Sequence, residues 1–234
     1  MDRITVIQKI INRKKARTYL EIGVQRGRCF FQIKARKKIG VDPLFSITKR
    51  DKIKAVFKNS TNLFNEYYAM TSDDFFNTKS KILTRYGLDV AFVDGLHTYA
   101  QSLKDVKNIL KVIKEDGVIV MHDCNPPYEA AACPANSYED AENQNIDGWK
   151  GDWCGDVWKA LVCLRATRND LSIFVLDCDY GLGIVTKGTP ENTLPYSKEE
   201  IDNFSYTDLS NNRRELLNLK SIDYLNEFSR RFDN

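Results

Sequence analysis

The hydrophobic residues of the chain form short runs that alternate with longer amphipathic stretches. The runs are four to seven residues long and mostly apolar, as buried parallel strands are, with a few charged residues within or at their ends. Five of them predict strands, at 18–24, 38–42, 67–70, 88–94 and 118–121. The stretches before and between them predict helices. These helices are expected at 2–15, 28–37, 49–58, 75–86 and 98–116.

The stretch 88–124 has the clearest pattern. Thr98 and Gln101 are spaced as in a capping box, which predicts the start of a helix directly after the strand. An apolar stripe at helical spacing follows, and Gly117 is suited to the residue just past the helix end. We therefore expect a strand, a helix and a second strand here.

The pattern changes after residue 124. Residues 124–155 are rich in Asn, Asp, Glu, Pro and Gly, and loops of this length are usually functional or disordered. A helix is expected at 156–168, and the apolar runs 171–177 and 183–187 around a short glycine-containing turn predict a hairpin. Residues 190–234 are polar, with scattered apolar positions that predict helical pieces on the outside.

This alternation predicts an α/β fold with a doubly wound, Rossmann-like sheet. We expect seven strands, mostly parallel, with one antiparallel strand from the C-terminal hairpin. Residues 1–189 are expected to form the main domain, with an N-terminal helix and a long loop. Residues 190–234 are expected to be a helical appendage and not an independent domain. In such sheets, ligands bind at the carboxyl ends of the strands.

Charge is distributed unevenly along the 234 residues, although the net charge is only +3. Residues 1–60 carry 17 Lys and Arg against 4 Asp and Glu. Such a bias is found on surfaces that bind nucleic acid, but also on ordinary solvated faces. The basic residues are not interleaved with aromatic residues, as a strand-binding groove would require. We therefore favour the solvated face, and nucleic acid is not the preferred partner.

The six cysteines form no C-x-x-C pair, which argues against zinc-ribbon and redox motifs. Several lie within apolar segments, as buried free thiols do, which is typical of a reduced, cytoplasmic protein. No apolar run reaches membrane-spanning length, and the N-terminus lacks a secretory signal. We therefore expect a cytoplasmic protein without a membrane partner.

The first candidate site is a glycine turn after the first strand. It contains Glu21, Gly23 and Gly27, and it allows backbone N–H groups to approach a ligand closely. It does not match the dinucleotide-binding fingerprint, because the third glycine is missing. It does not match the phosphate loop, because it has no Gly-Lys-Ser/Thr. Asp42 ends the second strand before Pro43, and it is either a ligand-binding acid or part of a simple turn.

The second candidate site joins the ends of two strands. Asp94 and His97 follow the fourth strand, and His122 and Asp123 follow the fifth. The chain has only these two histidines. Carboxylates suit Mg²⁺, whereas an imidazole ligand shifts the preference towards Mn²⁺, Fe²⁺ or Zn²⁺. Each histidine alone could be a structural residue, but the convergence of two imidazoles and two carboxylates favours a functional site.

These motifs resemble a known family. The turn with an acid two residues before the first glycine, in acid-x-Gly-x-x-x-Gly, resembles motif I of class I S-adenosylmethionine-dependent methyltransferases. The segments VDGLHTYAQSLKDV and GVIVMHDC resemble the macrocin- and mycinamicin-type sugar O-methyltransferases of methyltransferase domain family 24. Catechol O-methyltransferase is a more distant relative. The resemblance covers residues 18–187.

The resemblance implies a set of cofactor-binding residues. In this family the acid after the second strand binds the ribose hydroxyls, which implies this role for Asp42. The adenine is held after the third strand, where Asp73 lies; Asp73 could equally be a helix-capping residue. The implied S-adenosylmethionine-binding residues are Glu21, Gly23, Gly27, Asp42, Asp73 and Asp94.

The resemblance also implies a metal site and a base. Asp94 and Asp123 match the metal-binding acids, and His97 matches the histidine that acts as general base three residues after the first acid. His122 stands where the closest relatives have an acid, and it is included as a metal ligand with Asp94 and Asp123. The expected metal is Mg²⁺. An imidazole, with a reference pKa of about 6.5, can accept a proton near neutrality.

The implied activity is methyl transfer from S-adenosylmethionine to a hydroxyl of a small molecule, such as a sugar or a glycosylated product. One alternative is a methyltransferase that acts on RNA or protein. Another is a metal-dependent hydrolase that uses the two acids and two histidines of the second site, and a third is a non-catalytic binding module. The oligomeric state, including a homo-oligomer, stays open.

Aromatic residues in the long loop have two interpretations. They could stack on the acceptor, or they could form a small hydrophobic cluster that holds the loop in place. The sequence favours neither. These residues are Tyr128, Tyr138, Trp149 and Trp153.

Overall fold

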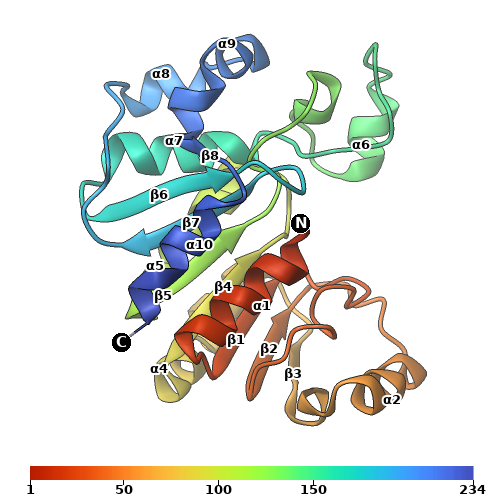
Figure 1. Ribbon diagram of the computed structural model, residues 1–234. Helices are drawn as coiled ribbons and strands as arrows, with labels where there is room; N and C mark the ends of the chain where they lie inside the picture. The colour runs from red at the N-terminus through yellow and green to blue at the C-terminus, as the bar shows by residue number, and fades with distance from the viewer. Residues whose placement is uncertain (234) are drawn as a thin grey trace. The chain divides into compact units, whose positions relative to one another are not determined.

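The computed structural model describes residues 1–233, and its strands and helices alternate as expected (Figure 1). Eight strands form one sheet in the order β3-β2-β1-β4-β5-β7-β6-β8. They are β1 Thr18–Ile22, β2 Lys37–Val41, β3 Glu66–Tyr68, β4 Leu88–Val93, β5 Ile113–Met121, β6 Leu171–Leu176, β7 Leu182–Lys187 and β8 Leu219–Lys220. The α/β Rossmann-like class is confirmed, with one strand more than the seven predicted.

The chain divides into two units. The first consists of Met1–Gly95, Asp105–Val120 and the residues from Asn226 onward. The second consists of Leu96–Lys104 and Met121–Leu225. The division expected at residue 189 stays a prediction.

Parallel pairing around β1 organises the first unit. β1 pairs in parallel with β2 and β4, so that Leu20 faces Ile39 on one side and Ala91 on the other. All residues of β1 and β4 are buried, which explains why the sequence shows apolar runs instead of alternation. The helices whose bounds fall within this unit are α1 Arg3–Lys14, α2 Lys49–Lys58, α3 Ser72–Thr78 and α4 Lys81–Tyr86, with the 3₁₀ helices η1 Ser60–Phe64 and η3 Arg230–Phe232.

The helix predicted at 28–37 does not form; the segment is a series of turns. Its backbone carbonyls accept hydrogen bonds from side chains elsewhere. The buried Lys38 ammonium donates to the carbonyls of Phe30 (2.8 Å) and Ile33 (2.9 Å). The Asn59 amide donates to Ile33 (3.0 Å), and both Asn59 and Asn62 donate to Phe31. Buried carbonyls need partners, and here distant polar residues supply them instead of a helical ladder.

Two further expectations for the first unit need correction. The helix predicted at 75–86 is divided into α3 and α4. Strand β5 begins at Ile113, five residues earlier than its predicted start at 118. Gly117 therefore lies inside the strand and does not end a helix; helix α5, Tyr99–Leu110, ends before it.

The second unit contains the hairpin and most of the C-terminal residues. β6 and β7 are antiparallel with Leu171 opposite Lys187, which confirms the predicted hairpin. β8 pairs with β6 in parallel and is the eighth strand; its two residues are too few to show a periodic pattern. The helices from residue 124 onward are η2 Ala130–Ala132, α6 Tyr138–Asn143, α7 Val157–Thr167, α8 Lys198–Asp202, α9 Tyr206–Leu217, α10 Tyr224–Ser229 and η3 Arg230–Phe232.

All six cysteines are free, and only Cys178 is not fully buried. Among residues 1–233, none of the helices has the length and apolarity needed to cross a bilayer.

We expect the buried Lys38 network to be essential for stability. Lys38→Met would leave the carbonyls of Phe30 and Ile33 and the Asn62 side-chain oxygen without this donor. Because an unsatisfied buried acceptor costs about 1–3 kcal/mol, the free energy of unfolding should fall by about 2–4 kcal/mol in urea titrations. The exposed Lys49→Met control should change it by less than about 0.5 kcal/mol. Equal stabilities of the two variants would contradict a structural role for the network.

Candidate active site

The glycine turn after β1 makes close backbone contact with the end of β4. Gly23 has φ +86°, and a Cβ placed on it would lie 1.9 Å from the carbonyl oxygen of Asp94. Only glycine therefore fits this position. Gly27 has φ +73° and lies against the ring of Phe31, so a side chain there would also collide. Steric contacts thus explain why glycine occupies both positions, while the binding of a cofactor by these glycines stays a prediction.

Asp42 connects the glycine turn to the end of β2. Its carboxylate accepts hydrogen bonds from the backbone N–H groups of Gln25 (2.8 Å) and Leu44 (2.7 Å). Gln25 has φ 46°, in the left-handed region, and the bond from Asp42 helps to hold it there. Asp42 therefore does more than end a strand. A carboxylate has further lone pairs, so these bonds leave it able to accept from a ribose hydroxyl as well.

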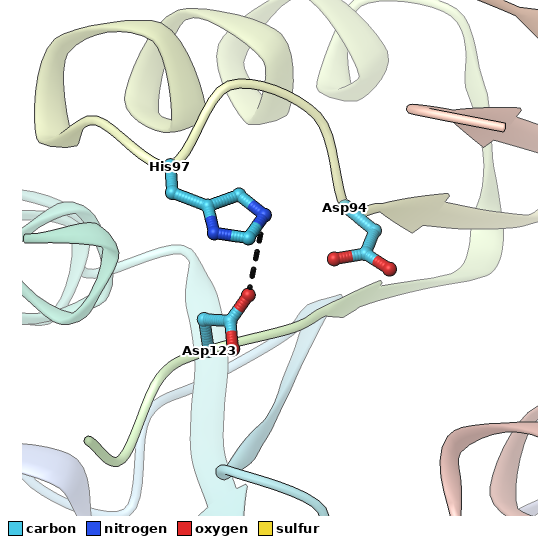
Figure 2. A group of neighbouring side chains, drawn as sticks. All are labelled: Asp94, His97 and Asp123. Carbon is cyan, nitrogen blue, oxygen red and sulfur yellow. Dashed lines mark ion pairs between the residues drawn. The ribbon is translucent and has the colours of Figure 1, made fainter. Parts of the chain in front are cut away.

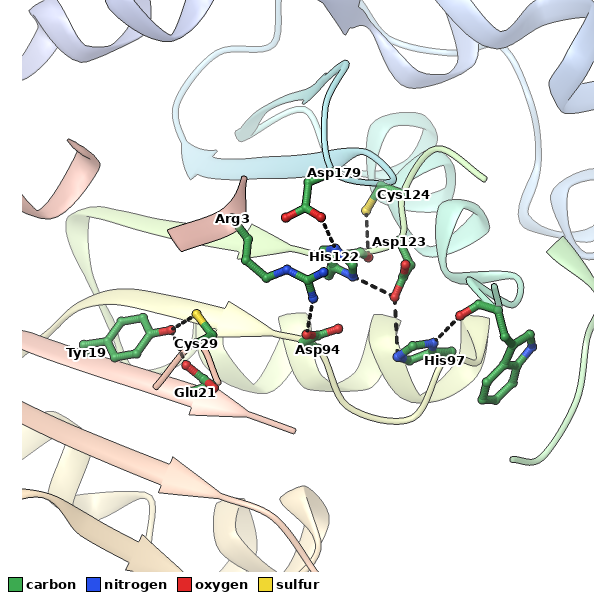
Figure 3. Close-up of polar contacts among 11 residues, drawn as sticks. Arg3, Tyr19, Glu21, Cys29, Asp94, His97, His122, Asp123, Cys124 and Asp179 are labelled. Atoms are coloured by element: carbon green, nitrogen blue, oxygen red, sulfur yellow. Dashed lines mark hydrogen bonds and ion pairs between the residues drawn. The ribbon is translucent and has the colours of Figure 1, made fainter. Parts of the chain in front are cut away.

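Glu21 lies inside the first unit next to Tyr19 and Cys29 (Figure 3). The Tyr19 hydroxyl donates to the Glu21 carboxylate at 2.6 Å. The pKa of Glu21 is raised to about 8, mainly by burial and to a smaller extent by the nearby Asp94 carboxylate. Its predicted contact with a cofactor stays a prediction.

Asp94, directly after β4, forms an ion pair with Arg3 of helix α1. The Arg3 guanidinium donates to Asp94 Oδ2 at 2.9 Å, with both side chains partly buried (Figure 3). Sequence reasoning did not identify Arg3 as a site residue. It is one of many basic residues in the N-terminal region, and no spacing sets it apart.

His97 lies between two contacts within the second unit. Its Nδ1 is 2.8 Å from the carbonyl oxygen of Trp153, and its Nε2 is 3.4 Å from Asp123 Oδ2 (Figure 3). The two rings of His97 and Trp153 are stacked with centroids 5.0 Å apart. The predicted base therefore has one nitrogen fixed by the backbone and the other directed at the predicted metal ligand.

His122 lies between two carboxylates. Its Nδ1 is 2.8 Å from Asp123 Oδ2, and its Nε2 is 3.5 Å from Asp179 Oδ1. His122 and Asp123 are both buried, and Asp179 is in the turn between β6 and β7. Asp179 was missed by sequence reasoning, since an acid in a hairpin turn carries no distinguishing signal.

Asp94, His97 and Asp123 form a group that could hold a metal ion (Figure 2). One ligand atom from each lies within 4.8 Å of the others. Asp94 and His97 are three residues apart on the same turn, and Asp123 approaches His97 in the second unit. Two carboxylate oxygens and one imidazole nitrogen fit a divalent cation. The group thus contains both predicted acids together with His97, the predicted base, and the role of His122 as a ligand stays a prediction.

The loop aromatics largely contact other loop residues. Trp149 and Trp153 pack against a small cluster of Cys133, Ala135 and Ala141. The Tyr138 ring lies 5.9 Å from that of Trp149. These contacts support the interpretation in which aromatic residues hold the loop in place.

The remaining predicted residues lie in other local arrangements. The Tyr128 hydroxyl donates to Asp152 at 2.9 Å, another contact within the loop. Asp73 is in the first turn of α3, whose N-cap is Thr71. Its predicted adenine contact stays a prediction.

Comparison with known proteins finds a similar family for part of this chain. Residues 20–124 match the family model Methyltransf_24, described as a methyltransferase domain. A search of curated proteins found no match. The match covers less than half of the chain, and the order of the strands in the sheet is that of a Rossmann-like fold.

Solved structures of O-methyltransferases share the fold. The O-methyltransferase from Bacillus cereus, in complex with S-adenosylhomocysteine, has 14% identity and a TM-score of 0.55, covering 79% of this chain and 80% of its own. TomG from Streptomyces achromogenes, an O-methyltransferase involved in tomaymycin synthesis and solved with S-adenosylmethionine, has 14% identity and a TM-score of 0.53, covering 78% of each chain. A putative caffeoyl-CoA O-methyltransferase from Staphylococcus aureus has 16% identity and a TM-score of 0.53, covering 80% and 85%.

The raised pKa of Glu21 predicts a pH-dependent contribution to stability. In the folded state the pKa is about 8, above the ordinary value of 4.5, so folding favours the protonated form. This contribution is fully present below pH 4.5 and is lost as the pH rises through 8, at up to about 1.4 kcal/mol per pH unit. Glu21→Gln cannot ionise, so it should gain stability relative to the wild type between pH 5 and pH 9.

Urea titrations across this pH range measure the difference between the two proteins. The exposed Glu139→Gln serves as control and should show a constant difference. A pH-independent difference for Glu21→Gln would contradict burial of an ionisable carboxyl.

Proposed function

We propose that this protein transfers a methyl group from S-adenosylmethionine to a hydroxyl of a small molecule, with His97 as the base and a divalent cation held by Asp94 and Asp123. The observation that carries the proposal is the approach of His97 Nε2 to Asp123 Oδ2, with Asp94 in the same group. These residues follow β4 and β5, the strands whose ends carry the resemblance to sugar O-methyltransferases.

The cofactor side of the proposal rests on the glycine turn. Gly23 holds the turn after β1 against the backbone of Asp94, and Asp42 holds Gln25 in its left-handed conformation. This leaves backbone and carboxylate groups at the carboxyl end of β1 and β2, where cofactors bind in such sheets. The structures from Bacillus cereus and Streptomyces achromogenes, solved with S-adenosylhomocysteine and S-adenosylmethionine, support the same cofactor.

The acceptor side depends on proton removal. The methyl group is already activated on a sulfonium, so the chain has to align an acceptor hydroxyl and take its proton. Nδ1 of His97 must donate its hydrogen to the Trp153 carbonyl, which can only accept. Nε2 is therefore the nitrogen that can take the acceptor proton, and Asp123 Oδ2 at 3.4 Å would stabilise the imidazolium. A divalent cation at the acids would lower the pKa of the bound hydroxyl.

A small-molecule acceptor, such as a sugar or a glycosylated product, follows from the resemblance of the residues after β4 and β5. The putative caffeoyl-CoA O-methyltransferase and TomG support O-methyl transfer on this fold. RNA and protein acceptors are alternative outcomes of the experiments.

The first prediction concerns the cofactor. S-adenosylhomocysteine should bind the purified protein in calorimetry, and Asp42→Asn should weaken binding by at least tenfold, because one acceptor oxygen is replaced by a donor. The exposed Asp147→Asn in the long loop should bind like the wild type. Absence of binding to the wild type would contradict the methyltransferase assignment. Unchanged binding to Asp42→Asn would contradict only the role of this acid.

The second prediction concerns transfer. Purified protein with radiolabelled S-adenosylmethionine and Mg²⁺ should label a member of a panel of glycosides, free sugars and catechols. His97→Gln should lower the rate by about 10²–10⁴-fold, the usual contribution of a general base. Asp94→Asn and Asp123→Asn, or treatment with EDTA, should abolish the metal-dependent part, while Asp147→Asn should keep full activity.

Three outcomes would contradict this second prediction. Label found only in added RNA or protein would reject the small-molecule acceptor. Transfer unaffected by EDTA would reject the metal. Full activity of His97→Gln would reject the base.

A further inference from the structure

We infer that residues Trp153–Asp156 form a clamp that positions His97 and fixes which of its ring nitrogens carries the hydrogen. The inference rests on the proposed function, because it concerns the residue proposed as the base. All of the contacts lie within the second unit. They involve the ring of His97, its carbonyl group and the start of the helix that follows it.

The first contact fixes the ring. The Trp153 carbonyl oxygen lies 2.8 Å from His97 Nδ1, and a carbonyl can only accept a hydrogen bond. Nδ1 therefore carries the hydrogen, and the neutral ring keeps its lone pair on Nε2. The indole of Trp153 stacks on the imidazole at 28° between ring planes, which restricts rotation of the ring. The backbone and the side chain of Trp153 thus set the tautomer and the orientation together.

The second contact fixes the backbone of His97. Gly155 has φ +60°, and a Cβ on it would lie 1.8 Å from the His97 carbonyl oxygen and 3.2 Å from the His97 Cβ. The two main chains therefore lie in direct contact, and any side chain at position 155 would displace His97.

The third contact fixes the helix that begins after His97. Asp156 precedes helix α7, and its side chain makes no capping bond to that helix. Its Oδ1 instead accepts from the backbone N–H of Tyr99, the first residue of α5, at 2.6 Å. Asp156 therefore caps α5, two residues after His97, and satisfies one of the N–H groups that a helix start leaves open.

The clamp is itself held by the long loop. The backbone N–H groups of Cys154 and Gly155 both donate to the carbonyl of Ala131, at 2.7 and 3.1 Å. The Trp153 indole N–H donates to the carbonyl of Cys133 at 3.0 Å. The end of the loop 124–155, which contacts His97, is thus held by hydrogen bonds to the rest of the loop, a role that its length and polar composition did not reveal.

The chain offers a matched pair of glycine variants to test the clamp. Gly155 and Gly148 both have positive φ, +60° and +80°, so alanine introduces backbone strain at each. Only Gly155 has neighbours; nothing lies within 4 Å of a Cβ at Gly148. A difference between Gly155→Ala and Gly148→Ala therefore reports the contact with His97 and not strain.

Nitrogen-15 spectra of the imidazole rings provide the readout, since the chain has only two histidines. His97→Gln assigns the His97 signals, and spectra are recorded without metal at a pH at which their ¹⁵N shifts show a neutral ring. The wild type and Gly148→Ala should show the hydrogen of His97 on Nδ1. In Gly155→Ala, the one-bond coupling between the His97 Nδ1 nitrogen and its hydrogen should disappear, or the signals of both tautomers should be present. Asp156→Ala, which keeps the glycine, is the second variant if Gly155→Ala does not fold, and it should shift the His97 signals in the same direction.

Two results would overturn the clamp. One is a wild-type His97 with its hydrogen on Nε2. The other is a His97 spectrum that stays unchanged in whichever of Gly155→Ala and Asp156→Ala folds. Neither result depends on methyl transfer. Conversely, full transfer by His97→Gln would reject the proposed base while leaving the Nδ1 assignment in place, so that the two failures are distinguishable.

Discussion

The carboxylate of Asp123 is the group on which the arrangement at the end of β5 depends. It is buried, and a ring nitrogen of each histidine lies near the same oxygen, that of His97 at 3.4 Å and that of His122 at 2.8 Å. A buried carboxylate is costly unless charged or polar groups surround it. Asp123 itself has φ 60°, in the left-handed region, so the backbone is turned to place it there.

The same carboxylate gives His122 a physical role. His122 stands where the resembling sugar enzymes have an acid, and it lies between Asp123 and Asp179. An acid at this position would add a third carboxylate next to two others, whereas an imidazole can be placed between them. In this chain the second carboxylate comes from the turn between β6 and β7, which supplies Asp179. Asp94 has its own partner in Arg3, so each acid of the proposed metal group is accompanied by a basic side chain.

No helix follows the glycine turn after β1, so side chains from other parts of the chain hold the segment in place. Residues 28–37 form turns whose carbonyls accept from Lys38, Asn59 and Asn62. The turn is also held by Asp42 and by the contact of Gly23 with Asp94. In the second unit the loop 124–155 is ordered by its own polar and aromatic contacts. Both irregular segments thus owe their shape to specific partners and not to regular secondary structure.

Sequence alone determined the features that depend on neighbouring residues. Burial on both faces makes β1 and β4 apolar, and helical spacing marks α1 and α2, so their positions follow from local periodicity. Asp94 and Asp123 could be identified because they lie one and two residues after such strands, whose carboxyl ends form the binding edge of this fold. The tertiary structure decided the features whose partners are distant in the chain. Lys38 donates hydrogen bonds to the turns that form where a helix was predicted. Arg3 contacts Asp94, and Asp179 lies close to His122. The Trp153 carbonyl contacts the His97 ring. No local pattern reveals these contacts, because each depends on segments that meet only after the chain has folded.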